Sequence, residues 1–175
     1  MPSPVGHALA GLTVHVLVAR NLADPHDRRR AAVAVAAALA PDVDLLFFLV
    51  DGRNHHNHET HSIGFACGAA IVALGAARAW QWARPVNLGV AAGFAWLSHV
   101  LLDYLNVDTT PPIGIMALWP VTSGFHKFPW PLFLDIGRTL AWATVRHDAL
   151  AAAWEAAILA PLLWGVWRLR QGGGN

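Results

Sequence analysis

The sequence has one cysteine and few charged residues. Because Cys67 is alone, no disulfide can form within the chain and a metal site built on thiolates is excluded. Cys67 lies in an apolar run, so we expect it to be a small buried thiol. Charged residues make up 13% of the chain, well below the roughly 25% of ordinary soluble proteins. The net charge of +1 gives no general field that would attract nucleic acid, so we expect no nucleic-acid partner.

The sequence also lacks an uninterrupted run of about 20 apolar residues, the pattern of a simple membrane-spanning helix. Hydrophobic residues nevertheless make up 55% of the chain. Residues 62–77 form a 16-residue stretch without a charge, and the other long apolar stretches are interrupted by a few ionisable groups, among them His7, His15, His99 and Glu155. Ionisable groups at membrane depth are costly and usually functional. We therefore expect a membrane protein with a polar interior. The N-terminus shows no basic region followed by a clean apolar core, so we expect no removable signal peptide.

Alanine and leucine dominate the apolar stretches, and turn-forming residues separate them. This pattern predicts an all-α fold, a polytopic helical membrane bundle of about five helices. We expect the helices near residues 6–20, 30–41, 62–83, 86–105 and 149–170. Residues 106–131 are rich in proline and glycine and should form an irregular loop that covers one end of the bundle. Residues 133–147 could form a short amphipathic helix at the membrane interface. Nothing marks a domain boundary, so residues 1–175 should form a single membrane-embedded domain.

If successive helices run up and down through the bundle, the charged residues between them separate between its two ends. One end of the bundle collects eight of the 12 basic residues: Arg20, Arg28, Arg29, Arg30, Arg78, Arg84, Arg168 and Arg170. The other end receives four basic residues, Arg138 among them, and eight of the 11 acidic ones: Asp42, Asp44, Asp51, Glu59, Asp103, Asp108, Asp135 and Asp148. Because Lys and Arg favour cytoplasmic loops, we expect the basic end in the cytoplasm and the acidic, histidine-rich end outside. Five crossings with the N-terminus outside would follow.

Two pairs of polar residues lie within or directly after predicted helices. His99 and Asp103 are four residues apart, so their side chains share one helix face and could hold a metal ion between them. The alternative is a simple hydrogen bond between them. Asp42 and Asp44 follow a predicted helix end, where one Asp could cap the next helix. Two acids one residue apart in an apolar context exceed what a cap needs.

The remaining candidates are histidines. His56 and His61 lie in a polar segment, residues 51–62, that also contains His55 and His58. This segment could be only a surface tract that scavenges metals, and Thr60 or Ser62 could cap the helix that follows. His7 begins the first helix, at the same end of the bundle. All these candidates are expected at the same end of the bundle. We therefore predict a divalent-metal site there, with ligands drawn from His7, Asp42, Asp44, His56, His61, His99 and Asp103.

Mixed histidine and carboxylate ligands suit zinc best, with manganese as the alternative. Seven candidates exceed the four ligands of one zinc ion, so two metals with shared carboxylates are an option.

Five stretches taken in order resemble the YdjM-type membrane-bound metal-dependent hydrolases: residues 6–7, 41–44, 56–62, 99–103 and 118–120. That family is remotely similar to bacterial zinc-dependent phospholipase C and to fungal zinc nucleases, which are all-helical enzymes with clustered metals. The resemblance therefore implies phosphoester hydrolysis in a bacterial inner membrane. This chain departs from the family pattern at Asn57 and His58, where Arg and Gly are common. Nothing after His126 matches the later His-x-x-x-Glu pair of the phospholipases.

The expected function is metal-assisted hydrolysis of a small or lipid-like phosphoester near the periplasmic side of the bilayer, with Asp44 or Asp42 as the catalytic base. The alternative is a membrane protein that binds or transports metal ions without hydrolysis. Such a protein needs a polar route through the bundle, for which the helices offer only His15 and Glu155. A third interpretation is a scaffold in which the histidine-rich end is structural.

Overall fold

A computed structural model describes residues 1–19, 27–137 and 139–172 of the chain. Five long helices make up the bundle: α1 (Pro4–Val18), α2 (Asp27–Leu39), α4 (Ile63–Ala79), α5 (Pro85–Tyr104) and α6 (Trp142–Gly172). Shorter helical turns complete the fold: the 3-10 helix η1 (Ala40–Phe47), the helix α3 (Phe48–Asp51) and the 3-10 helix η2 (Glu59–His61). Among the described residues only two isolated β-bridges occur, so the predicted all-α class is confirmed.

Three helical segments of the described chain are long and apolar enough to cross a membrane: Asp27–Asp51, Pro85–Tyr104 and Trp142–Gln171. The first of them is α2 continued through η1 and α3. The helices α1 and α4 are apolar but shorter. The predicted membrane bundle is therefore confirmed, while the number of crossings stays a prediction.

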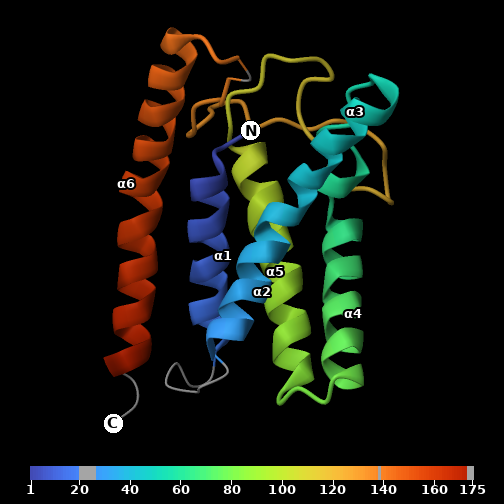
Figure 1. The fold of residues 1–175 in the computed structure, drawn as a ribbon, viewed down its shortest axis with the longest axis vertical. Coiled ribbons are helices and arrows are strands. Elements are labelled where there is room, and N and C mark those ends of the chain that lie inside the picture. The colour runs from blue at the N-terminus through green and yellow to red at the C-terminus, as the bar shows by residue number, and fades with distance from the viewer. Residues whose placement is uncertain (20–26, 138, 173–175) are drawn as a thin grey trace.

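The bundle is built around α5, with α1, α2 and α4 packed against it and α6 packed along α1 (Figure 1). Small residues allow these close approaches. A Cβ atom added at Gly11 of α1 would lie 2.8 Å from the Cβ of Ala38 in α2, and one at Gly93 of α5 would lie 2.9 Å from the Cβ of Ala70 in α4. Larger side chains at either glycine would push these helices apart.

One end of the bundle holds the last turns of α1, α4 and α6 and the first turns of α2 and α5 (Figure 1, lower end). The opposite end holds the N-terminus, α3 and the loops around residues 52–62 and 105–141. Helix order thus separates the basic and the acidic residues as the sequence predicted. Arg20 and Arg138 lie outside the described residues.

The loop that follows α5 covers the acidic end, as predicted. It folds back on the bundle through backbone hydrogen bonds such as Val107 N–H to the Phe133 carbonyl, 3.0 Å, and Leu132 N–H to the Leu105 carbonyl, 2.7 Å. Phe133 is buried in a small apolar core with Ala10, Leu102 and Leu159. The loop is therefore fastened to three helices rather than lying free over them.

Two sequence-based expectations are wrong. Residues 133–147 form no separate amphipathic helix, because Phe133 enters the core from an extended segment and α6 begins at Trp142. Cys67 is exposed, because α4 turns the opposite side, with Ala66 and Ala77, toward its neighbours. The helix expected to end near residue 41 ends at Leu39, and the chain continues directly as the 3-10 helix η1.

Candidate metal centre

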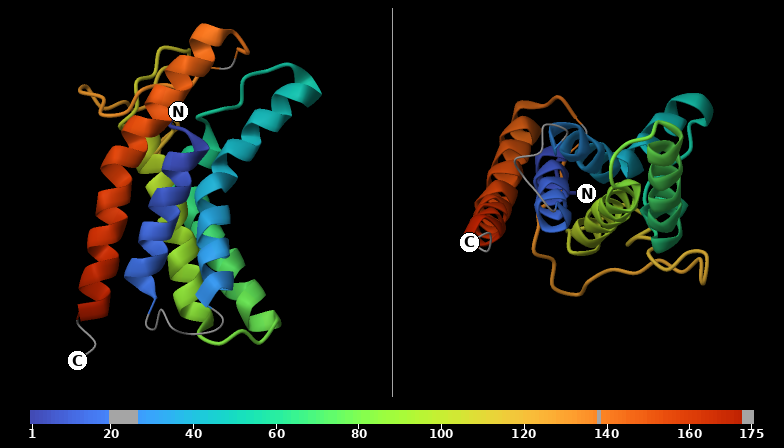
Figure 2. Two further views of the ribbon diagram at one scale, coloured as in Figure 1. Left: turned by 60° about the vertical axis from the view of Figure 1, so that its left-hand side comes forward. Right: turned by 90° about the horizontal axis from the view of Figure 1, so that it is seen from below.

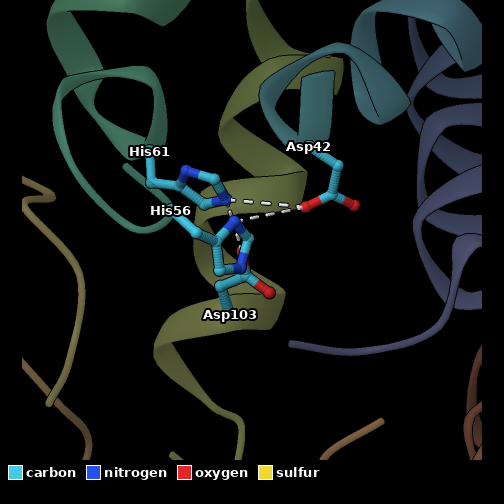
Figure 3. A group of neighbouring side chains, drawn as sticks. All are labelled: Asp42, His56, His61 and Asp103. Atoms are coloured by element: carbon cyan, nitrogen blue, oxygen red, sulfur yellow. Dashed lines mark ion pairs between the residues drawn. The ribbon is translucent and has the colours of Figure 1, made fainter. Parts of the chain in front are cut away.

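Four polar atoms from three separate parts of the chain converge beside α5, near the acidic end. His61 Nε2 lies 3.0 Å from Asp103 Oδ2 and 3.1 Å from His99 Nε2. His99 Nε2 lies 3.1 Å from the same Asp103 oxygen. Asp42 Oδ1 completes the group at 3.7 Å from His61 Nε2 and 3.6 Å from His99 Nε2. Figure 3 shows Asp42, His61 and Asp103 pointing toward one another from η1, η2 and α5.

The hydrogen bonds behind the two imidazoles fix which ring nitrogen faces the centre. His99 Nδ1 donates to the backbone carbonyl of Ala38, 2.7 Å away. His61 Nδ1 lies 3.0 Å from the Thr60 hydroxyl oxygen and 3.2 Å from Asp44 Oδ2. Both of these are acceptors, because the Thr60 hydroxyl donates its own proton to Asp44 Oδ2 (2.6 Å). In the neutral rings each Nδ1 therefore carries the proton, and each Nε2 presents a lone pair to the centre.

Local structure explains how Asp42 and Asp44 reach opposite sides of His61. Pro41 lies at the start of η1 and has no N–H to donate, and the chain tightens there from α-helix to 3-10 helix. Two residues along such a helix are about 240° apart around its axis. Asp42 accordingly faces Nε2 of His61, while Asp44 faces Nδ1 of the same ring.

His56 lies at the edge of this group. Its Nδ1 is 3.0 Å from Asp44 Oδ1 and 3.9 Å from Asp42 Oδ1, and its ring meets that of His61 edge-on. Its Nε2 is buried and has no hydrogen-bond partner among the described residues. His56 also lines a polar cavity of about 260 Å³ together with Asn54 and Asn57 and with residues of the covering loop. This cavity gives the centre a polar approach from the acidic end.

His7 adds a second position next to the first. Its ring stacks on that of His99 with centroids 3.7 Å apart and planes 17° from parallel. Its Nε2 lies 3.7 Å from Asp103 Oδ1, the oxygen that does not face His61. Neither ring nitrogen of His7 has a hydrogen-bond partner in the described part of the chain. His7, His99 and Asp103 thus form a second group that could hold an ion, and Asp103 also belongs to the first such group, together with Asp42, His56 and His61.

The centre is shielded from solvent. His7, His61 and His99 are fully buried, and Asp42 is the most exposed carboxylate of the group, with 15% of its side chain accessible. Burial by itself lowers the pKa of His61, but the carboxylates of Asp103, Asp42 and Asp44 outweigh it and raise that pKa well above its usual value. A positive charge is therefore strongly favoured at this point of the interior.

The residues fit a divalent metal ion. Tetrahedral ligands about 2.0–2.1 Å from zinc lie about 3.3 Å from one another, and the separations given above for the central atoms run from 3.0 to 3.7 Å. Asp42 Oδ1 and both carboxylate oxygens of Asp103 are buried without a hydrogen-bond partner among the residues described. Buried charged oxygens normally have partners, so their geometry suits coordination better than hydrogen bonding. A buried His/Asp group that could hold a metal ion is thus present.

Comparison with known proteins shows the family to which this chain belongs. Residues 1–173 match the family described as YdjM inner membrane protein. The chain belongs to the YdjM family. It is also 26% identical over 171 residues to inner membrane protein YbcI of Escherichia coli (strain K12), covering 95% of this chain and 91% of that protein. No solved structure matches the chain. Family membership and the three membrane-length helices together support a location in the bacterial inner membrane.

All seven candidate residues predicted from the sequence of this YdjM family member lie at one end of the bundle, and we call these seven side chains the His/Asp cluster: His7, Asp42, Asp44, His56, His61, His99 and Asp103. Their positions within it differ. Asp44 contacts the outer nitrogen of His61 and the ring of His56, so it lies one layer behind the central group. The assignment of ligands stays a prediction.

Other contributors were missed or given another role. Ser62 caps α4 by accepting from Phe65 N–H, so Thr60 is free to bind Asp44 instead. The carbonyl of Ala38 left no signal in the sequence, because any residue has one. The Trp96 indole donates to the Thr60 carbonyl (2.8 Å) and holds the loop in place. Trp96 lies three residues before His99 on α5, and this spacing could have indicated from the sequence that it lies near the site.

Residues 118–120, the Leu-Trp-Pro segment that resembles the YdjM family, lie beside the first turn of α4. The carbonyls of Ala117 and Trp119 accept from the N–H groups of Ile63 and Gly64, at 2.9 and 3.0 Å. A Cβ atom at Gly64 would lie 2.7 Å from the Trp119 ring, so glycine allows this contact. The covering loop is thereby held beside η2, which carries His61.

Proposed function

We propose that this YdjM family member is an integral, multi-pass membrane protein that hydrolyses a phosphoester, including a lipid-like one, with the help of a divalent metal ion held by the His/Asp cluster. Zinc is the first choice and manganese the alternative, because the ligands are imidazoles and carboxylates. The observation that carries the proposal is the approach of two imidazole Nε2 atoms to 3.1 Å with two carboxylate oxygens beside them. Two facing lone pairs repel each other unless a proton or a metal ion lies between them, and the two carboxylates beside them favour the more highly charged metal ion.

In this proposal His61, His99, Asp103 and Asp42 hold the ion, and His7, together with His99 and Asp103, could hold a second ion. A divalent ion at this position would polarise a phosphoryl oxygen and lower the pKa of a water molecule. The Ala38 carbonyl and Asp44 keep the rings of His99 and His61 in the orientation that presents Nε2.

Of the two candidate bases, Asp42 is better placed to accept a proton. Both oxygens of Asp44 are engaged, Oδ1 near His56 Nδ1 and Oδ2 by the Thr60 hydroxyl. In Asp42, Oδ1 faces the proposed ion, which leaves Oδ2 of this partly accessible carboxylate to accept a proton. We therefore assign the base to Asp42 and an orienting role to Asp44.

The polar cavity at His56 supports a substrate that enters from the acidic end, which we propose to be periplasmic. Its walls come from parts of the chain that are far apart in sequence: Met1, residues 54–57, residues 107–110 and residues 135–137. The charge distribution supports this orientation, since basic residues gather at the other end. A phosphoester group presented at the membrane surface would reach the His/Asp cluster by this route.

The test is metal analysis of detergent-purified protein, followed by a screen of phosphomonoesters, phosphodiesters and phospholipids. His99→Ala and Asp103→Ala should remove both bound metal and activity. His55→Ala is the matched control: this loop histidine is 41% exposed and pairs with Asp51, so metal content and activity should be retained. Metal content unchanged in His99→Ala and Asp103→Ala, with the fold intact by size-exclusion chromatography, would overturn the proposal.

The transport alternative finds less support. His15 lies 3.1 Å from Asp27 near the basic end, and Glu155 accepts hydrogen bonds from Ser3 near the N-terminus of α1. Both groups are thus occupied at opposite ends of the bundle. Zinc or manganese flux into sealed vesicles, without hydrolysis of any phosphoester, would favour transport over catalysis.

A further inference from the structure

The basic end of the bundle carries a second feature that the metal centre does not use. An apolar groove of about 350 Å³ runs between α2 and α4, with α5 as its floor. Its walls include Val33 and Ala36 of α2 and Val72 and Ala76 of α4, and Ala92 and Trp96 of α5 lie beneath them. All its lining side chains are Ala, Val, Leu or Trp. Figure 2 shows α2 and α4 on either side of α5, seen along the bundle.

A basic pocket adjoins this groove. It has a volume of about 240 Å³ and is lined by Arg29, Arg30, Gln81, Trp82 and Ala83. Trp82 lines both the pocket and the groove, so the two spaces lie next to each other. The Arg30 guanidinium donates to the Ala83 carbonyl (3.2 Å), which ties the start of α2 to the turn between α4 and α5. None of the described residues that line the pocket is acidic.

We propose that this face binds an anionic phospholipid, with an acyl chain in the groove and the headgroup phosphate in the basic pocket. Guanidinium groups offer several donors in a fixed plane and match the oxygens of a phosphate. Tryptophan is favoured at the level of lipid headgroups, and Trp80 and Trp82 lie there, where the groove meets the pocket. The apolar and the cationic halves of the surface thus match the two halves of one lipid molecule.

The location favours a lipid over a soluble anion. The groove lies between segments of membrane length, and two of its three walls belong to Asp27–Asp51 and Pro85–Tyr104. Lipid acyl chains would therefore surround the groove, and the basic pocket would provide selectivity for an anionic headgroup. The basic end is also the end expected in the cytoplasm, where the leaflet surface is negative.

The groove extends toward the metal centre without being part of it. Its far end is formed by Ala40, next to Pro41 of η1, and by Trp96, whose indole holds the Thr60 carbonyl. The arginines lie at the opposite end of the bundle. Lipid binding is therefore a separate property, and its test does not depend on hydrolysis.

The test is native mass spectrometry of the detergent-purified protein with phosphatidylglycerol or phosphatidylcholine of identical acyl chains. The wild type should retain phosphatidylglycerol in preference. Arg29→Gln should lower that preference about fivefold, the effect of one basic residue at an anionic headgroup. Arg28→Gln is the matched control, because Arg28 is the neighbouring residue and does not line the pocket; its effect should stay below about twofold.

A second pair of variants tests the groove. Val72→Trp should reduce retention of both lipids, because Val72 lines the groove. Ile71→Trp should not, because Ile71 is equally exposed, 70% against 71%, and lies outside the groove. Both positions face outward, so neither tryptophan should disturb the helix packing, which circular dichroism can check.

Three results would overturn the proposal. Equal retention of the two lipids by the wild type would remove the headgroup selectivity. Arginine-dependent binding of inorganic phosphate without retained lipid would mean a site for a free anion. A concentration-dependent dimer that Val72→Trp abolishes and Ile71→Trp does not would mean that the groove holds a second copy of the chain.

Discussion

The Nε2 atoms of His61 and His99 face each other at 3.1 Å, and each ring is anchored through its other nitrogen. The two residues come from a loop and from a helix that are 38 positions apart in sequence. Neutral rings in this arrangement direct two lone pairs at one point, and Asp103 Oδ2 approaches the same point from 3.0 Å and 3.1 Å. The proposed metal position follows from this single relationship.

Asp44→Asn should weaken metal binding without abolishing it. Asp44 contacts the far nitrogen of His61 and the Thr60 hydroxyl rather than the central group, and loss of such an orienting partner typically costs about 10–100-fold in metal affinity. Competition with a chelator of known affinity measures the change. Asp103→Asn, which alters a central carboxylate, should have the larger effect, and the reverse order would contradict the roles assigned here.

His7→Ala should separate the two proposed metal positions. His7 Nε2 lies 3.7 Å from Asp103 Oδ1 and belongs to the second group, so one ion should remain in the first position. We expect the metal-to-protein ratio to fall by one ion from the wild-type value if the second position is filled, whereas His61→Ala should disturb the first. Elemental analysis of both variants gives the ratios. Complete loss of metal in His7→Ala would assign His7 to the first position instead.

Glu155→Gln should lower stability and leave the metal centre intact. Glu155 is fully buried on α6, and it accepts hydrogen bonds from Ser3 N–H, 2.8 Å, and from the Ser3 hydroxyl. Weakening this buried contact should cost about 1–3 kcal/mol and lower Tm in detergent. Ser3→Ala, which removes the partner, should lower Tm similarly. A large drop in metal content with unchanged Tm would instead link Glu155 to an ion path.

Membrane orientation can be tested independently of any substrate. A reporter fused after residue 175 should report cytoplasm, and a cysteine placed at Asn54 should be labelled from the periplasmic side. The labelling requires a Cys67→Ala background, because Cys67 is exposed on α4. Replacing Arg28, Arg29 and Arg30 by acidic residues should weaken the orientation. Labelling at residue 54 only from the cytoplasm would move the centre to the other side of the membrane.

The sequence by itself determined the helical class, the separation of charges and the positions from which the candidate ligands come. Helix composition and turn residues are local properties, and once helix order is known, charges at helix ends fall at one end or the other. The spacing of His99 and Asp103 fixed a shared helix face, and the structure has their side chains 3.1 Å apart. The errors at residues 133–147 and at Cys67 arose because burial depends on which helix faces have neighbours.

Only the tertiary structure decided which atoms meet. Whether Asp42 or Asp44 faces the centre depends on the 3-10 twist of η1 and on the position of η2 beside it. The Ala38 carbonyl became a partner of His99 because α2 packs against α5, and a carbonyl leaves no trace in the sequence. The groove between α2 and α4 exists because both helices pack on α5, leaving space between them. Side-chain type is set residue by residue, whereas contact between distant residues is set by how the helices pack.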